Sequence, residues 1–413
     1  MNYEQFYARR AGGMKKSAIR EFFSLTEQPD VVSFAGGFPS GDYFPLQFIS
    51  EMMQDLLREE GKIALQYGPT EGSRELREYL AGKMSREGYK CTAENILITN
   101  GSQQGMDLIG KILIDPQDIV IVEEPGYVGG LGAIHSYQAD RLPVPLDEEG
   151  LRVDMLAAKL PELQKKGRMP KFAYVVPNFQ NPTGICMSLA RRRRLLELAQ
   201  EYDFLILEDN PYGEICFKGS PPPSIKSLDK EGRVIYLGSF SKTFCPGIRI
   251  GWMAADEELI EKIVCAKGST DLCSNSLGQR IAYRFASTGR LDEHVALLAA
   301  QYKKKRDVML DCMEKYFPEG VSWTRPEGGF FIWVTFPKGI SAREILLKAI
   351  ERKVAFVDGS GFYVNGNGKN TGRFAFSESS PEEIEKGIAN LGEILREELQ
   401  AREIVPCPDR RLA

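Results

Sequence analysis

Short apolar runs alternate with longer amphipathic segments through much of the chain, and this alternation restricts the fold more than any other feature. A short apolar run is typical of a buried strand, whereas the longer segments have helical periodicity. The pattern predicts βαβ units and a mostly parallel sheet. We expect strands at Ile96–Thr99, Ile119–Glu123, Phe172–Val176, Phe204–Glu208, Val234–Leu237 and Ile248–Ala254. We expect helices at Leu46–Glu60, Arg74–Arg86, Gln103–Ile114 and Leu189–Tyr202.

The pattern changes near residue 290. A long charged segment, Leu291–Tyr316, leads into the strand-like runs FFIWVTF, VAFVD and GRFAFS, and a capped helix follows from Ser380. A chain of 413 residues exceeds one simple core, so a second unit is expected. We predict a large α/β domain over residues 46–290, and a smaller α+β domain formed by residues 1–45 and 291–413.

Composition excludes several classes of function. The chain has 53 basic and 57 acidic residues, so its net charge of −4 gives no field that would attract nucleic acid or membrane. Eight cysteines without a CxxC pair and only two histidines predict neither a metal site nor a disulfide framework, but reduced thiols in a cytoplasmic protein. No apolar run approaches the roughly 18 residues of a membrane span.

The arginines at 191–194 could suggest a nucleic-acid patch. They follow the possible helix cap Ser188, so we expect a solvated helix face instead.

Polar motifs follow five of the predicted strands. In a parallel α/β sheet, ligands bind outside the carboxyl ends of the strands. Each motif alone is also typical of an ordinary turn or helix cap, but their convergence on one edge favours a pocket. The motifs are Asn100-Gly101-Ser102-Gln103, Pro125-Gly126-Tyr127, Asn181-Pro182-Thr183-Gly184, Asp209-Asn210-Pro211-Tyr212 and Ser239-Phe240-Ser241-Lys242.

These side chains suit one kind of ligand. A carboxylate such as Asp209 and a phenol such as Tyr212 match a heterocycle with a basic nitrogen and a neighbouring oxygen, and Lys242 supplies an amine that reacts with an aldehyde. Helix-terminal N–H groups, hydroxyls and a guanidinium match a phosphate. The phosphate candidates are Ser102, Gln103, Ser239, Ser241 and Arg249. Pyridoxal 5′-phosphate (PLP) meets all these requirements.

The same motifs give the chain its resemblance to a known family. With Tyr67-Gly68-Pro69 before them and Arg373-Phe374-Ala375-Phe376 after them, they resemble fold-type I PLP-dependent aminotransferases of class I/II. Within this family, the chain most resembles the branch of 2-aminoadipate and kynurenine aminotransferases. This resemblance is carried by Ser17-Ala18-Ile19-Arg20, the segment 33–39 and Gln103-Gln104. The resemblance implies a large domain with a mostly parallel, seven-stranded type of sheet.

The resemblance also implies a role for each site residue. Lys242 would hold the cofactor covalently and move the substrate proton, and Asp209 would pair with the pyridine nitrogen. Tyr212 and Asn181 would contact the ring oxygen, and Tyr127 would stack on the ring. The phosphate candidates would hold the cofactor phosphate, and Tyr67 would reach the phosphate of a partner subunit in a homodimer with shared active sites. Arg373 would clamp the substrate carboxylate, with Asn181, Gly37 and Arg20 completing the substrate site.

Alternative functions remain open at this point. The resemblance implies transamination, for which the expected donor is an L-amino acid, either 2-aminoadipate or an aromatic or branched-chain amino acid, and the expected acceptor is a 2-oxo acid, with 2-oxoglutarate as the first candidate. The same frame also supports a β-lyase or a decarboxylase, because it does not dictate which bond to Cα breaks. A regulator effector domain is less expected, since no helix-turn-helix segment precedes the motifs and the charge is not basic.

Overall fold

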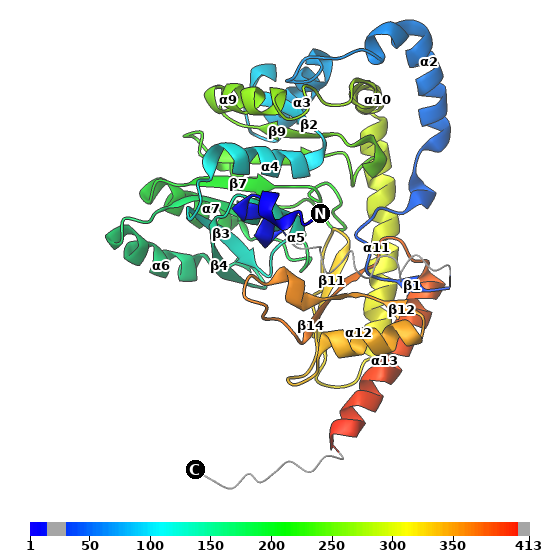
Figure 1. Cartoon of the computed structure of the whole chain (residues 1–413). Coiled ribbons are helices and arrows are strands. Elements are labelled where there is room, and N and C mark those ends of the chain that lie inside the picture. Colours follow the sequence, from blue (N-terminus) through cyan, green and yellow to red (C-terminus); the bar gives the residue numbers. More distant parts are fainter. Residues whose placement is uncertain (15–29, 404–413) are drawn as a thin grey trace.

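Figure 1 shows the computed structural model, which describes residues 1–14 and 30–403. Its largest element is an eight-stranded sheet in the order β2-β9-β8-β7-β6-β3-β4-β5. The strands β8, β7, β6, β3 and β4 run parallel to one another, whereas β9 is antiparallel to both β2 and β8 and the two-residue β5 is antiparallel to β4. The expected mostly parallel sheet is therefore confirmed, and β5 adds a short eighth strand at its edge.

The strands of this sheet lie close to their predicted positions. Their bounds are β2 Ile96–Thr99, β3 Ile119–Glu124, β4 Asp140–Asp147, β5 Gly150–Leu151, β6 Pro170–Val175, β7 Leu205–Asp209, β8 Val234–Ser239 and β9 Gly251–Ala254. The strand β4 was not predicted, and its Pro143 and Pro145 are residues that usually argue against a strand. It nevertheless pairs in parallel register with β3. The predicted strand from Ile248 was too long, since Ile248 ends a 3-10 turn before β9.

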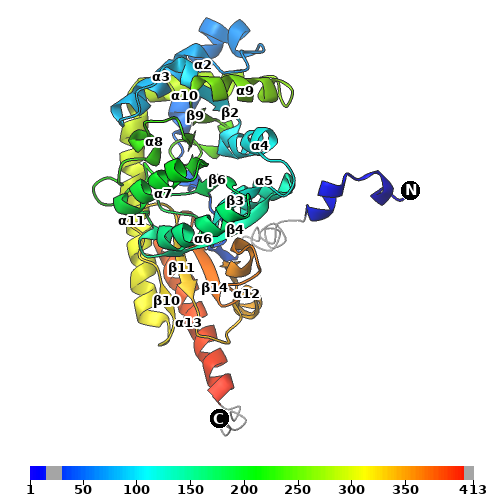
Figure 2. The ribbon, with the colours of Figure 1, turned by 90° about the vertical axis from the view of Figure 1, so that its left-hand side faces the viewer.

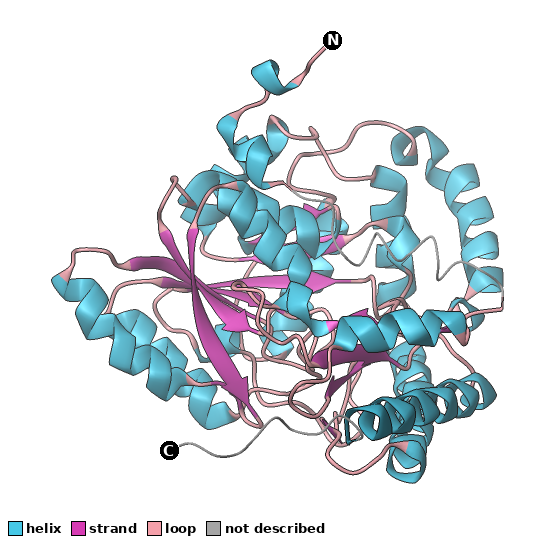
Figure 3. Cartoon of the chain, turned by 60° about the horizontal axis from the view of Figure 1, so that its bottom comes forward, coloured by secondary structure: helices cyan, strands magenta, loops and turns pink. Residues whose placement is uncertain are grey.

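Helices cover both faces of the large sheet, so that it forms the middle of three layers (Figures 2 and 3). On one face, Val120 and Val122 of β3 contact the core shared with α4, α5 and α9. On the other, Ile121 packs into the core of α6 and α7. This alternation is the expected result of a strand whose successive side chains point to opposite faces. The helices are α4 Gly101–Leu113, α5 Val128–Ser136, α6 Val153–Lys165, α7 Leu189–Glu201, α8 Ile225–Leu228 and α9 Glu257–Gly268.

A second sheet has four antiparallel strands in the order β10-β11-β14-β13. Its strands are β10 Ser322–Trp323, β11 Phe331–Thr335, β13 Val357–Asp358 and β14 Thr371–Ala375. It shares one apolar core with residues of α11 Arg290–Tyr316, α12 Ala342–Glu351 and α13 Pro381–Glu403. Near the N-terminus, β1 Val32–Ser33 pairs in parallel with β12 Val354–Ala355. The other α-helices in the described ranges are α2 Leu46–Ala64, α3 Arg74–Arg86 and α10 Ser276–Ser287.

The arginine run at the start of α7 is less solvated than expected. Ser188 caps the helix as predicted, because its Oγ accepts from the N–H of Arg191. Arg192, however, is fully buried and donates to the carbonyl oxygens of Met187 and Pro177. These bonds satisfy a guanidinium that would be costly to bury alone. In the described ranges, no helix is long and apolar enough to span a membrane.

Candidate active site

A cavity of about 850 Å³ lies at the carboxyl ends of the parallel strands, where the sequence placed the ligand site. The cavity gathers most of the predicted site residues: Gly37, Ser102, Gln103, Tyr127, Asn181, Asp209, Tyr212, Ser239, Ser241, Lys242, Arg249 and Arg373. Tyr67 does not line it, and its side chain is 79% exposed. Arg20 lies outside the described residues.

Lys242 follows the end of β8, and its side chain is half-buried in the cavity. Its Nζ donates to the carbonyl oxygen of Gly37 at 2.8 Å. Burial lowers the pKa of Lys242 to about 8, and the cations Arg373 and Arg249 act in the same direction. An amine with this pKa is partly neutral near physiological pH, and the neutral amine is the form that attacks an aldehyde.

Asp209 is the last residue of β7 and is almost completely buried. Its Oδ2 accepts a hydrogen bond from the hydroxyl of Tyr174 at 3.0 Å, whereas its Oδ1 is buried without a partner among the described residues. Burial raises the pKa of Asp209 to about 7. A buried acceptor without a donor is costly, so this oxygen suits a ligand that brings an N–H group. The protonated ring nitrogen of PLP is such a donor.

The opposite end of the cavity suits an anion. Ser102 and Gln103 occupy the first turn of α4, whose first N–H groups receive no side-chain cap from Asn100. Arg249 leans over this turn and donates from Nη2 to the carbonyl oxygen of Asn100 at 3.2 Å. Free N–H groups, the helix dipole and a guanidinium together favour a phosphate. The helix begins at Gly101, two residues before the predicted start at Gln103.

Two features favour glycine at position 101, and its backbone conformation is the stronger of them. Its φ of +72° is a conformation that side chains disfavour, and a Cβ there would lie 2.6 Å from Nη2 of Arg249. The other two serines of the predicted phosphate set lie at the end of β8, where the N–H of Ser241 donates to Oγ of Ser239 at 3.1 Å. Both serines line the cavity together with Ser102 and Arg249.

Arg373 comes from β14 and is buried against the same cavity. It donates from Nη1 to Oδ1 of Asn181 at 3.0 Å and from Nη2 to the carbonyl oxygen of Ala35 at 2.6 Å, and its guanidinium lies 4.4 Å from the ring centre of Phe331. Burial lowers the pKa of Arg373 to about 10. A buried guanidinium held in this way is suited to a carboxylate, which would restore its lost solvation.

Two tyrosines complete the wall. The hydroxyl of Tyr127, just before α5, approaches Oε1 of Gln103 at 3.5 Å, and Nε2 of Gln103 donates to the carbonyl oxygen of Gly129 at 3.0 Å. Tyr212 is buried with its ring edge-on to the rings of Phe330 and Phe331. Burial raises the pKa of Tyr212, so its hydroxyl stays protonated and can donate a hydrogen bond.

Tyr174 and Gln180 were not predicted from the sequence, although both hold site residues in position through hydrogen bonds. Tyr174 lies inside the apolar run of β6, where it resembles a core residue, yet it holds Asp209. Gln180 is buried and donates to Oε2 of Glu123 at 3.1 Å, while its Oε1 accepts from the N–H of Thr183 at 2.9 Å. It thereby fixes the turn that carries Asn181. For Gln180, its position beside the predicted Asn181 turn was a signal, whereas nothing in the sequence distinguishes Tyr174 from a core residue.

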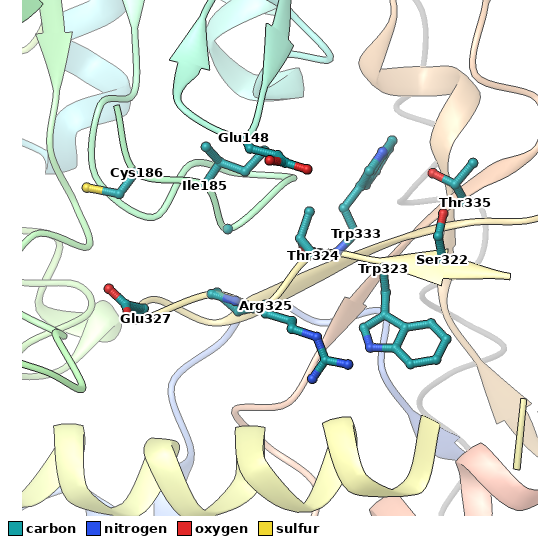
Figure 4. Close-up of a pocket in the computed structure, with 12 residues that line it drawn as sticks. Glu148, Ile185, Cys186, Ser322, Trp323, Thr324, Arg325, Glu327, Trp333 and Thr335 are labelled. Carbon is teal, nitrogen blue, oxygen red and sulfur yellow. Dashed lines mark hydrogen bonds between the residues drawn. The ribbon is translucent and has the colours of Figure 1, made fainter. Parts of the chain in front are cut away.

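A second cavity, of about 720 Å³, lies between the segment 184–186 and the strands β10 and β11 (Figure 4). It combines the indoles of Trp323 and Trp333 with charged side chains such as Arg325, which forms an ion pair with Glu314. None of the described residues that line it is a lysine, and none has a predicted catalytic or cofactor role. The convergent polar groups that define a reactive site are therefore in the first cavity.

The fold and the first cavity together define a PLP-dependent enzyme of fold type I, and residues 29–391 match the family described as aminotransferase class I and II. The chain belongs to this family. It is 46% identical over 402 residues to aromatic-amino-acid aminotransferase 1 of Thermococcus litoralis, with 97% of this chain and 96% of that protein covered.

Solved structures agree with this assignment. A multiple substrate aminotransferase of Thermococcus profundus superimposes with a TM-score of 0.93 at 45% identity and covers 97% of this chain and 100% of its own. An α-aminoadipate aminotransferase of Thermus thermophilus, complexed with N-(5′-phosphopyridoxyl)-L-leucine, gives a TM-score of 0.90 at 36% identity and covers 97% of this chain and 100% of its own. The chain is an aminotransferase whose cofactor is pyridoxal phosphate, and it moves amino groups between amino acids and 2-oxo acids.

Proposed function

We propose that Lys242 binds PLP covalently through Nζ, that Asp209 pairs with the ring nitrogen, and that Arg373 holds the α-carboxylate of the substrate. The observation that carries this proposal is the buried, unpartnered Oδ1 of Asp209 in the same cavity as the amine of Lys242. The pKa of that amine, lowered to about 8, supports a group that reacts as a neutral nucleophile.

When bound, PLP supplies a protonated ring that withdraws electrons from the bonds at the substrate Cα. The role of Asp209 is to keep the ring nitrogen protonated, because its buried carboxylate is stabilised by a cationic N–H partner. Arg373 fixes the orientation of the substrate, so that the Cα–H bond faces Lys242. The amine of Lys242 then takes the proton from Cα, a positioned general base that is commonly worth about 10²–10⁴ in rate.

The other predicted residues are assigned by the end of the cavity that they line. Tyr127 stacks on the ring, and Tyr212 with Asn181 contacts the ring oxygen. The anion end holds the phosphate through Ser102, Gln103, Ser239, Ser241 and Arg249. Its support is the uncapped first turn of α4 beneath the Arg249 guanidinium.

For the substrates, we propose an L-amino acid donor with an aromatic, 2-aminoadipate or branched-chain side chain, and 2-oxoglutarate as the acceptor. The names of the Thermococcus litoralis and Thermus thermophilus relatives support the aromatic and 2-aminoadipate donors. The exposed ring of Phe38 lines the cavity next to Gly37 and offers a surface for an apolar side chain. Arg20 remains the candidate for a distal carboxylate.

We further propose a cytoplasmic homodimer with shared active sites. Tyr67 is exposed and lies outside its own cavity, which suits a residue that reaches the phosphate of a partner subunit. Exposed apolar side chains close to it in sequence, Ile63 and Leu65, suit a subunit interface. The described cysteines are all free, as is usual in a reducing compartment.

The experiment is a panel of amino donors incubated with 2-oxoglutarate, in which glutamate and the oxo acid of each donor are quantified. Transamination produces the two in a one-to-one ratio and requires the acceptor. We expect the highest kcat/KM with aromatic amino acids or 2-aminoadipate. Pyruvate with ammonia, or carbon dioxide, released without an acceptor would instead support the β-lyase or decarboxylase alternative.

A further inference from the structure

A buried ionic cluster lies directly behind the anion end of the cavity. Lys267, the penultimate residue of α9, is fully buried, and its Nζ donates to both carboxylate oxygens of Asp271 at 2.7 and 2.9 Å. A buried ammonium is costly unless it is paired, so Asp271 is held firmly in this position. Asp271 lies in the connection between α9 and α10, and neither Lys267 nor Asp271 lines the cavity.

Asp271 has two further donors, and both come from the turn that begins α4. Nδ2 of Asn100 and Nε2 of Gln104 each lie 2.7 Å from Oδ2 of Asp271. Gln104 also turns its Oε1 to the N–H of Asn100, at 2.8 Å. The side chain of Gln104 therefore connects the backbone of the turn to the ionic cluster.

The front of the same turn meets the predicted phosphate ligands. The carbonyl oxygen of Asn100 accepts from Arg249, and the N–H groups of the following residues are those proposed to bind the phosphate. On the side of the turn away from the cavity, Gln104 holds the N–H of Asn100. The next residue, Gly101, has no side chain to restrict its backbone, so this contact limits a flexible position that adopts a φ of +72°. Arg249 and Gln104 thus hold opposite sides of one peptide segment.

We propose that Gln104 and Asp271 are positioning residues for the cofactor phosphate, which align the Asn100–Ser102 backbone without touching the cofactor. The inference rests on the proposed function, because it assumes that this turn binds the phosphate. Lys267 anchors Asp271, and Gln104 transmits that fixed position to the turn. Loss of this link leaves the N–H donors present but no longer held in one orientation.

The test compares two cofactor forms that differ only at the phosphate. Apo-protein is titrated with PLP and with pyridoxal, which carries the same aldehyde and ring, and both dissociation constants are measured from the visible absorbance. Gln104→Leu removes the bonds of Gln104 to Asp271 and to the N–H of Asn100, and leaves the Lys267–Asp271 pair and the Asn100 side-chain bond to Asp271 intact. We expect it to weaken PLP binding by about tenfold or more, the effect of losing roughly one charge-assisted hydrogen bond, and to change pyridoxal binding by less than about twofold.

Two further variants make the test specific. Asp271→Asn should show the same selective loss of PLP affinity. Because this substitution leaves the buried Lys267 with a weaker partner, the free energy of unfolding in urea is measured to check that the variant remains folded. Lys111→Met is the matched control: Lys111 joins α4 to Ser269 and Thr270 of the same connection, away from the turn, and its loss should change neither affinity.

Equal weakening of PLP and pyridoxal by Gln104→Leu would overturn the inference, since it would indicate a general structural role. Unchanged PLP affinity in the variant would overturn it as well. A wild-type protein that binds PLP no more tightly than pyridoxal would contradict the phosphate site itself, which is a failure of the proposed function and not only of this inference.

Discussion

Replacement of Arg373 by glutamine tests the substrate clamp quantitatively. In the structure, the two terminal nitrogens of this buried guanidinium donate to Asn181 and to Ala35, and a substrate carboxylate would bind to the same fork. Hydrogen bonds to charged groups contribute about 1.5–3 kcal/mol each, so loss of a two-bond clamp costs roughly 3–6 kcal/mol of transition-state stabilisation. The expected fall in kcat/KM for an amino acid is therefore about 10²–10⁴-fold.

The assay follows the visible absorbance of the PLP enzyme after addition of an amino donor in single turnover. Phenylalanine is compared with 2-phenylethylamine, which has the same side chain and amine but no carboxylate. The wild type should react much faster with phenylalanine than with 2-phenylethylamine. Arg373→Gln should lose the fast reaction with phenylalanine, but should react with 2-phenylethylamine at nearly the rate that the wild type shows with this amine. An equal loss for both substrates, or a loss for phenylalanine below about tenfold, would refute the clamp.

The same variant should remain folded. Burial lowers the pKa of Arg373 to about 10, which means that the fold disfavours the charged side chain in the absence of an anion. A neutral amide of shorter length removes this penalty and can still donate to one of the two acceptors. We expect the free energy of unfolding in urea to change by less than about 1 kcal/mol, and unchanged affinity for PLP confirms that the cavity is intact.

Two further predictions concern Lys242 and Tyr67. Because the pKa of Lys242 is lowered to about 8 from 10.5, the neutral amine increases as pH rises through 8, and so should the stopped-flow rate of covalent PLP loading. A loading rate that falls with pH would contradict this reasoning. Lys242 binds its proton more tightly in the unfolded state than in the folded state, so it should also make the free energy of unfolding of the apo-protein in urea increase between about pH 8 and 10.5. Mixed dimers of Tyr67→Ala and Lys242→Ala chains should regain one intact site and hence activity. No recovery would show that Tyr67 does not act across the interface.

Much of the site could be predicted because of one geometric rule. Parallel strands bring their carboxyl ends to one edge, so residues far apart in sequence, such as Asp209 and Lys242, could be placed together from the ends of apolar runs alone. The family resemblance added Arg373, which comes from a strand of the smaller sheet. Nothing in the local sequence around Arg373 distinguishes it from an arginine at a surface strand edge.

The supporting contacts could not be predicted, because they depend on pairings that no local pattern encodes. Tyr174 looks like any core residue in an apolar strand until its hydroxyl is seen to reach Asp209. Gln104 meets Asp271 across 167 positions of sequence, and Lys242 meets Gly37 across 205. The burial of Arg192 was also hidden, since a run of four arginines is usually a solvated surface.

The central claim is that Lys242 carries the cofactor, and it is tested most directly by reduction of the PLP-loaded protein with borohydride followed by peptide mass mapping. The account predicts that the yellow colour is lost and that a phosphopyridoxyl group is fixed to the peptide containing Lys242. Lys242→Ala should yield no fixed cofactor while its free energy of unfolding stays close to that of the wild type. A reduced adduct on another lysine, or one that persists in Lys242→Ala, would contradict the account.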